Sequence, residues 1–171
     1  MNNRIRLIFL FLVGFNLSTI AGGKGLTVYI FLSETCPICQ SVTIELKKLH
    51  QQFSPLQVEF IGLFPDGILS DAQTRVEFGK KYGLSFPLRS DSGQVLTRKF
   101  HAEITPEVVV VDNVTETILY RGKVDNSFAS LGKRRTVVTE HYLRTALESW
   151  MAGKKILLSE TQPVGCIIQK K

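Results

Sequence analysis

Apolar residues in the first part of the chain form two continuous runs separated by a helically spaced pattern. The run from 26 to 32, Leu-Thr-Val-Tyr-Ile-Phe-Leu, is rich in β-branched and aromatic residues, which predicts a strand buried on both faces. From Ile38 to Phe53 the apolar positions recur at helical spacing, so we expect a helix there. The apolar run from 58 to 63 predicts a second strand. Strands and helices therefore alternate early in the chain.

Capping residues set the expected limits of the first two helices. Thr35 is the expected N-cap of the first helix, and Pro37 is tolerated in its first turn. The sequence 70–73, Ser-Asp-Ala-Gln, has the form of a capping box, with Gln73 placed to reach back to the cap. The helix that it opens should end at Gly83.

The second half of the chain combines short strands with one further clear helix. We expect a short strand at 86–89, a short helix at 93–100, and a hairpin made by strands at 107–112 and 116–121. A polar stretch from 126 to 138 is the expected loop between this hairpin and the last helix.

The last helix has apolar residues at the spacing i, i+3, i+4, i+7 and i+8 between 143 and 151, with Thr139 as its expected cap and Gly153 as its stop. Alternating strands and helices followed by a hairpin and a helix predict an α/β sandwich with a mixed sheet between helices. A chain of 171 residues with 44% hydrophobic content can build one such core.

The start of the chain has the layout of a secretory signal peptide. Arg4 and Arg6 precede an apolar run from 7 to 17, and small residues follow. We expect residues 1–21 to be removed by cleavage after Ala21. The alternative is an uncleaved membrane anchor, for which the run is short against the roughly 20 residues of a spanning helix. Either interpretation predicts an exported domain, periplasmic or secreted, that contacts a membrane only through an uncleaved segment.

The net charge of the chain adds little to this interpretation. The sequence has 21 basic and 15 acidic residues, a net charge of +6. Removal of the expected signal peptide takes away two arginines, and 19 basic against 15 acidic residues leave +4. This mildly basic balance gives no reason to expect a nucleic-acid partner.

The chain has three cysteines, Cys36, Cys39 and Cys166. Three is too few for a disulfide framework, and an odd number leaves one cysteine without a partner. Two of them form a Cys-Pro-Ile-Cys sequence where the first strand turns into the first helix. A thiol at a helix N-terminus faces unsatisfied N–H groups and the positive end of the helix dipole, which lower its pKa from about 8.5 to between roughly 3.5 and 7.5. We therefore expect Cys36 to be the nucleophile and Cys39 to resolve the mixed disulfide that it forms.

Other roles for the cysteine pair fit the sequence less well. A zinc site needs about four ligands, and the histidines at 50, 101 and 141 are scattered. Covalent haem requires a histidine after the second cysteine, but Gln40 stands there. We expect no metal and no cofactor. A purely structural disulfide between Cys36 and Cys39 remains an alternative, although a bridge that closes a loop of two residues gains little stabilisation from chain entropy.

These features together resemble a known fold. The strand, the Cys-Pro-Ile-Cys sequence, the helix, and Thr105-Pro106 before an apolar strand resemble the thioredoxin fold, a three-layer α/β/α sandwich with a mixed central sheet. Together with Tyr120-Arg121-Gly122 in the hairpin and Phe86-Pro87-Leu88, they are similar to exported thiol–disulfide oxidoreductases of the redoxin type. These are relatives of the alkyl hydroperoxide reductase and TlpA-like proteins.

The resemblance covers residues 25–153 and leaves 154–171 as a C-terminal tail that carries Cys166. It implies that Pro106 follows a cis peptide bond beside Cys36, and that the backbone of Thr105 pairs with an extended substrate. Thr105, Pro106 and Pro37 are then the expected substrate contacts. The implied partners are protein thiols or disulfides and an upstream redox protein that the sequence does not identify.

The sequence departs from this family at its proton-handling positions. Many thioredoxin-fold reductants keep a buried carboxylate near the second cysteine, but Ile30 and Val42 stand at those places. Glu45 lies six residues after Cys39 and should point away from it. The direction of electron flow is therefore open.

Two other functions would use the same thiols. A thiol peroxidase is favoured by Ser33, three residues before Cys36, and disfavoured by Tyr29, where peroxiredoxins carry proline. A copper(I)-binding accessory module would join Cys36, Cys39 and Cys166 as soft ligands. Cys166 lies in a segment similar to the C-terminal end of some bacterial redoxin-like proteins, and it could serve as a third redox thiol, bind copper or pack.

Overall fold

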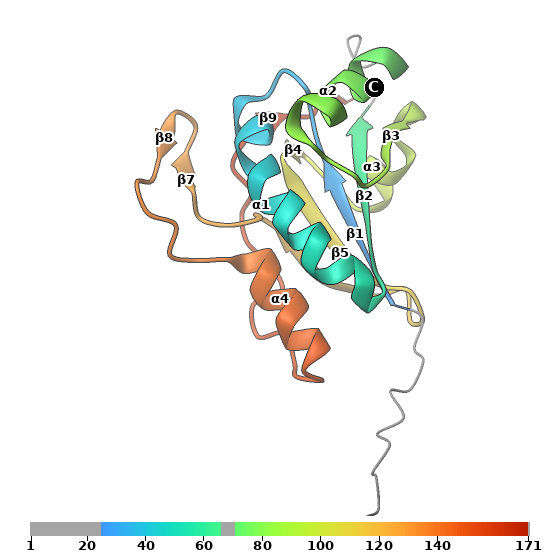
Figure 1. Cartoon of the computed structure of the whole chain (residues 1–171), viewed down its shortest axis with the longest axis vertical. Helices are drawn as coiled ribbons and strands as arrows, with labels where there is room; N and C mark the ends of the chain where they lie inside the picture. The colour runs from blue at the N-terminus through green and yellow to red at the C-terminus, as the bar shows by residue number, and fades with distance from the viewer. Residues whose placement is uncertain (1–24, 66–70, 171) are drawn as a thin grey trace, which may run out of the picture.

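The computed structural model describes residues 25–65 and 71–170. The expected signal peptide and Ser70 of the expected capping box lie outside these residues. Within them, a five-stranded mixed sheet forms the centre of the molecule (Figure 1). Its strand order is β3-β2-β1-β5-β6. The strands are β1 (Leu26–Phe31), β2 (Val58–Pro65), β3 (Leu88–Asp91), β5 (Glu107–Asp112) and β6 (Ile118–Gly122).

The mixed sheet predicted from the sequence is confirmed. β1, β2 and β3 run parallel, while β5 is antiparallel to both β1 and β6. β1 is the central strand and β5 is one of its two neighbours, and apart from one half-buried residue in each they are buried throughout. Their continuous apolar runs therefore have the character of strands that are covered on both faces.

Helices cover the two faces of the sheet unequally. One face is covered by α1 (Pro37–Phe53), α2 (Ala72–Tyr82) and α4 (Tyr142–Met151), and Figure 1 shows α1 and α4 in front of the sheet. The short α3 (Val95–Lys99) lies toward the other face.

Each face has its own hydrophobic core, so the predicted three-layer α/β/α arrangement is confirmed. The core under α1 and α4 includes Val28, Ile30, Leu46, Leu49, Leu143 and Leu147. The core on the other face includes Phe31, Leu63, Phe100, Val109 and Ile168. Neighbouring residues of β1 divide between the two cores because successive side chains of a strand point to opposite faces.

The remaining elements are short. Two 3-10 helices, η1 (Ser54–Leu56) and η2 (Ser92–Gln94), flank β2 and α3. β4 (Ile104–Thr105) pairs with β9 (Cys166–Ile167), and β7 (Phe128–Ser130) pairs with β8 (Lys133–Arg134).

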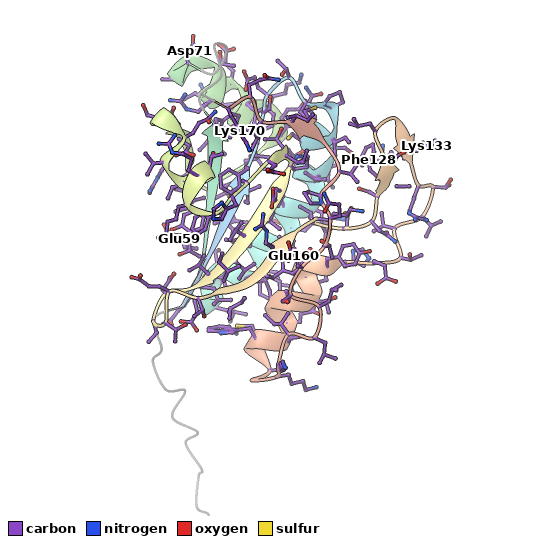
Figure 2. The ribbon with its side chains drawn as sticks, turned by 180° about the vertical axis from the view of Figure 1, so that it is seen from behind. Glu59, Asp71, Phe128, Lys133, Glu160 and Lys170 are labelled. Carbon is purple, nitrogen blue, oxygen red and sulfur yellow. The ribbon has the colours of Figure 1, made fainter. Side chains whose placement is uncertain are left out.

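The stretch from 126 to 138, predicted as a loop, contains the β7–β8 hairpin, so that prediction is wrong in part. Phe128 pairs with Arg134, and the N–H of Arg135 donates to the carbonyl of Ser127 at 2.7 Å. The strands are too short and too polar to give an alternating pattern in the sequence. This hairpin, marked β7 and β8 in Figure 1 and labelled at Phe128 and Lys133 in Figure 2, stands away from the body of the molecule.

The expected cap of the first helix is wrong. Cys36, not Thr35, stands at the N-cap of α1, and it makes no side-chain capping bond. The Thr35 hydroxyl instead lies 3.1 Å from the hydroxyl of Ser33. Because Pro37 takes the first helical position, the helix begins one residue later than a Thr35 cap would require.

The expected caps of α2 and α4 are also wrong. Asp71 caps α2 by accepting a bond from the N–H of Thr74 at 2.7 Å, while the Gln73 side chain donates to Glu77. In α4 the N-cap is His141, because Thr139 is held back by two hydrogen bonds with the Asn126 side chain. The C-terminal limits at Gly83 and Gly153 agree with the sequence, since both residues have positive φ.

The segment expected to be a tail packs along the sheet. Figure 2 shows it running between Glu160 and Lys170 from the α4 end of the molecule toward the α2 end. Its backbone pairs with Arg121 on β6 through Ser159 and Thr161, and with Glu103 through Ile168. In residues 25–65 and 71–170, no helix has both the length and the apolar character needed to cross a membrane.

Candidate active site

The two cysteines of the Cys-Pro-Ile-Cys sequence stand at the start of α1. Cys36 is the N-cap residue with extended backbone angles, φ −81° and ψ 115°, and the exposed Pro37 is the first helical residue. Cys39 lies in the first turn, and its sulfur accepts a hydrogen bond from the N–H of Ser33 at 3.4 Å. The local sequence therefore directs both thiols toward the end of β1, as the sequence predicted.

Thr105 and Pro106 face this pair from the other side of the site. The Thr105–Pro106 peptide bond is cis, as the resemblance implied. The Cys36 sulfur lies 3.2 Å from the carbonyl oxygen of Thr105, to which it donates only when it is protonated. A shallow hollow beside Pro106 is bordered by Ile38 on α1 and by Phe128 on β7. Of the expected substrate contacts, Pro37 is exposed, while Thr105 and Pro106 are buried.

The third cysteine lies directly against the first. The Cys166 thiol donates to the Cys36 sulfur at 2.8 Å, although 130 positions separate the two residues in the chain. All three cysteines are free thiols in this structure. β9 holds Cys166 in place by pairing with β4, so that Cys166 stands opposite Thr105.

Hydrogen bonds toward Cys36 lower its pKa to about 5. The largest contribution is the bond from the Cys39 thiol; burial opposes it, and bonds from the Cys166 thiol and from the N–H groups of Cys39 and Ile38 add to it. All of these donors favour the thiolate over the thiol. At pH 7 Cys36 is therefore mainly a thiolate.

The other two thiols shift in the opposite direction. Burial raises the pKa of Cys39 well above its ordinary value, and the hydrogen bond that it gives to Cys36 adds to this effect. Burial and the same kind of bond raise the pKa of Cys166 to about 11. The site therefore concentrates negative charge on Cys36 and keeps protons on its two neighbours.

Access to Cys36 is closed in this conformation. Its exposed fraction is 0%, as is that of Cys39, whereas Cys166 is half-buried. The cover over Cys36 includes the strand β9. A substrate therefore reaches Cys36 only after part of this cover moves.

The structure places apolar side chains at the positions beside Cys39 where the sequence lacks a carboxylate. Ile30 and Val42 are both buried there, and Glu45 forms an ion pair with Arg144 of α4 at 2.8 Å. A buried acid, Glu107, follows Pro106 but pairs with Arg121 at 2.9 Å.

Sequence reasoning missed the residues that hold the tail on the site. A Cβ atom at Gly165 would lie 2.0 Å from the carbonyl oxygen of Thr105, and one at Gly122 would lie 2.1 Å from that of Thr161. The Thr161 hydroxyl contacts the Tyr120 hydroxyl at 2.7 Å and accepts from the N–H of Lys123 at 2.9 Å. The only sign of this packing in the sequence is glycine at 122 and at 165. Each of these glycines lies against a residue that is distant in the chain.

The described part of the chain contains no group of three or more His, Cys, Asp or Glu residues arranged to hold a metal ion. The three cysteines meet as a hydrogen-bonded set, in which two thiols donate to the third.

Comparisons with known proteins agree with this geometry. Residues 14–123 match the family described as AhpC/TSA. Peroxiredoxin 1 of Sulfurisphaera tokodaii is 29% identical over 84 residues, which cover 47% of this chain and 39% of that protein. The chain thus spans about two fifths of the length of the curated relatives that it matches.

Two solved structures show the same fold. An uncharacterized conserved protein from Geobacillus kaustophilus superposes with a TM-score of 0.77 at 24% identity, covering 87% of this chain and 79% of its own. A secreted Mycobacterium tuberculosis disulfide oxidoreductase, homologous to E. coli DsbE, has a TM-score of 0.54 at 17% identity, covering 74% and 83%.

Proposed function

The chain belongs to the AhpC/TSA family, and from this premise we propose that it is an exported thiol–disulfide oxidoreductase that exchanges dithiol and disulfide with other proteins. The observation that carries the proposal is the arrangement of the thiols at the start of α1: Cys39 and Cys166 donate to the Cys36 sulfur beside the cis Thr105–Pro106 bond, and Cys39 itself is buried. These contacts lower the pKa of Cys36 to about 5, and burial raises that of Cys39.

This asymmetry assigns the two steps of exchange. The Cys36 thiolate attacks one sulfur of a substrate disulfide, forms a mixed disulfide and expels the other substrate sulfur as a thiolate, which takes up a proton. Cys39 then loses its proton and attacks the Cys36 sulfur, which releases the second substrate sulfur and leaves a Cys36–Cys39 disulfide. The reverse sequence oxidises a substrate dithiol, so the site serves either direction.

Substrate binding is assigned to the backbone beside the pair. Thr105 belongs to β4, and Pro106 cannot donate a backbone hydrogen bond. An extended substrate segment would add to β4 as a strand and bring its sulfur to Cys36. Pro37 is exposed beside Cys36 and would contact the same segment.

A variant with one cysteine tests the proposal. In Cys39→Ser/Cys166→Ser only Cys36 remains, so a mixed disulfide with oxidised glutathione should form and persist. Cys36→Ser, which keeps both other thiols, should gain no glutathione under the same conditions. Intact-protein mass spectrometry after acid quenching measures both. If Cys36 alone gained no glutathione while the variant kept its fold by circular dichroism, the proposal would fail.

A thiol peroxidase is the second candidate, and it rests on the family description and on curated relatives that are named peroxiredoxins. There the Cys36 thiolate would attack the O–O bond of a peroxide, giving a sulfenic acid and an alcohol or water. The same one-cysteine variant separates the two functions. Thiol exchange predicts that Cys36 reacts faster with a protein disulfide than with hydrogen peroxide at equal concentration, and a peroxidase requires the reverse order.

Export is proposed from the sequence around Arg4, Arg6 and Ala21. Expression of the full chain in a bacterium and fractionation of the cells should place the protein outside the cytoplasm. N-terminal sequencing should then read from Gly22. A full-length chain in the cytoplasm would contradict the proposal for export without affecting the chemistry of Cys36.

A further inference from the structure

The strand β9 occupies the edge to which the proposed function assigns the substrate. Ile104 pairs with Ile167 and Thr105 with Cys166 in antiparallel register, and the N–H of Ile168 donates to the carbonyl of Glu103 at 2.8 Å. This is the pairing that an extended substrate strand would make with β4. The chain thus supplies its own strand to its own binding edge.

The fit of this segment is close at the backbone. Gly165 packs so tightly against Thr105 that any side chain would meet the Thr105 carbonyl, and Gly122 packs as tightly against Thr161. On either side of β9 the segment is tied to the body, by Thr161 through its hydroxyl contact with Tyr120 and by the side chain of Gln94, which donates to the Gln169 carbonyl at 2.6 Å. The position of Cys166 is therefore fixed by contacts on both sides of it in the chain.

We propose that Cys166 is a built-in substrate thiol: from its place on β9 it exchanges with the Cys36–Cys39 disulfide and gives the chain a second oxidised form, Cys36–Cys166. The inference rests on the proposed function of Cys36 and Cys39. It adds a third catalytic sulfur, since Cys166 touches the reacting atom.

The exchange is balanced within the chain. Cys166 gives up its proton, and its thiolate attacks the Cys36 sulfur. The Cys36–Cys166 bond forms, the Cys36–Cys39 bond breaks, and Cys39 leaves as a thiolate that takes up the proton. No net oxidation occurs, because one disulfide replaces another. Cys166 lies 2.8 Å from the Cys36 sulfur and Cys39 approaches the same atom from the first turn of α1, so both partners reach Cys36 without rearrangement of the helix.

The consequence concerns accessibility. Cys39 has an exposed fraction of 0%, while Cys166 is half-buried on a two-residue strand. Moving the disulfide from Cys39 to Cys166 carries it from the interior to a segment that a partner thiolate can approach. A partner attacking Cys166 would expel Cys36, whose thiolate is the most stable of the three.

The test uses Cys39→Ser, in which Cys166 is the only possible partner of Cys36. The reduced variant is treated with oxidised glutathione, quenched with acid at intervals and weighed as intact protein. We expect transient glutathione on Cys36, followed by its release and an internal disulfide that links the peptides containing Cys36 and Cys166. In Cys39→Ser/Cys166→Ser the glutathione should stay, with a release rate lower by on the order of tenfold or more.

A matched control checks that a change in β9 alone does not alter the release of glutathione from Cys36. Ile167 neighbours Cys166 on β9, and its side chain is 72% exposed. Cys39→Ser/Ile167→Ala should release glutathione as Cys39→Ser does. If Cys39→Ser instead kept its glutathione as long as the double serine variant, the inference would be overturned while the proposed function of Cys36 stood. If no variant gained glutathione, the proposed function itself would fail.

A second measurement needs no substitution. The wild-type chain, oxidised with glutathione and digested without reduction, should yield peptides joined through Cys36–Cys166 as well as through Cys36–Cys39. Exclusive recovery of Cys36–Cys39 from correctly folded oxidised protein would contradict the second oxidised form.

Discussion

Thr105 and Cys166 face each other across the β4–β9 pairing, and both contact the Cys36 sulfur, one through its carbonyl at 3.2 Å and the other through its thiol at 2.8 Å. β9, which pairs with the strand that precedes the cis proline, therefore brings Cys166 directly to Cys36. In this conformation Cys36 is covered, and the chain itself provides the cover.

Gly165→Ala should uncover Cys36. The added Cβ would lie 2.0 Å from the Thr105 carbonyl oxygen, a backbone atom that cannot give way cheaply, so β9 must move off β4. We expect alkylation of Cys36 by iodoacetamide at pH 7 to become faster, measured by quenched mass spectrometry. Ile167→Ala is the matched control, because Ile167 neighbours Cys166 on β9 and is 72% exposed, so its truncation leaves the pairing with β4 in place. Equal alkylation rates in Gly165→Ala and wild type would show that β9 does not control access.

The alkylation rate of Cys36 should depend on pH with a midpoint near 5. The thiolate is the reactive form, so the rate rises as pH increases through the lowered pKa and is level from about pH 6 upward. Cys39→Ala removes the largest cause of the lowered pKa and should move the midpoint to higher pH. Cys166→Ala removes one lesser hydrogen bond and should move it less.

Thiolate absorbance at 240 nm provides an independent measurement of the same midpoint in the reduced protein. If the midpoint of wild type lay near the ordinary thiol value of about 8.5, the assignment of Cys36 as the nucleophile would be wrong.

The ion pair between Arg121 and Glu107 should be important for folding stability. Glu107 has an exposed fraction of 1%, and Arg121 donates to it at 2.9 Å from β6. Arg121→Ala would leave a buried carboxylate without its partner, so we expect a loss near the lower end of roughly 3–5 kcal/mol, since Arg121 is itself partly exposed. Urea denaturation at pH 7 measures the loss.

The control for this prediction is Arg144→Ala, which breaks the more solvated pair with Glu45 and should cost about 1 kcal/mol or less. Arg121→Ala/Glu107→Gln should recover part of the stability lost in Arg121→Ala, because the buried charge is gone. Equal losses for the two arginine variants would contradict the special weight given to the buried pair.

Much of the fold was predictable because its central elements are strongly patterned. The continuous apolar runs of β1 and β5 and the helical spacing of α1 and α4 gave the elements to within a few residues. The cysteine pair was predictable for the same reason, since it stands at the junction of two such elements. The resemblance to the thioredoxin fold added the cis bond at Pro106, which spacing alone does not indicate.

The remaining features depend on contacts that leave no periodic signal. β9 has two residues, and its partner Thr105 lies 61 positions from Cys166, so only the folded chain reveals their pairing. The caps of α1 and α4 failed because these helices begin at Cys36 and His141, which make no side-chain capping bond, while the expected cap residues bond elsewhere. Thr139, for example, is bonded to Asn126 instead.

The most direct test of the central claim is a redox titration of the wild-type chain in glutathione buffers of defined ratio, with acid quenching, alkylation and peptide mapping. We expect Cys36 to pass from thiol to disulfide in one reversible two-electron transition, with its partner sulfur found within the chain. If Cys36 remained an alkylatable thiol at every glutathione ratio after equilibration, the account of this site as a thiol–disulfide exchange centre would be contradicted.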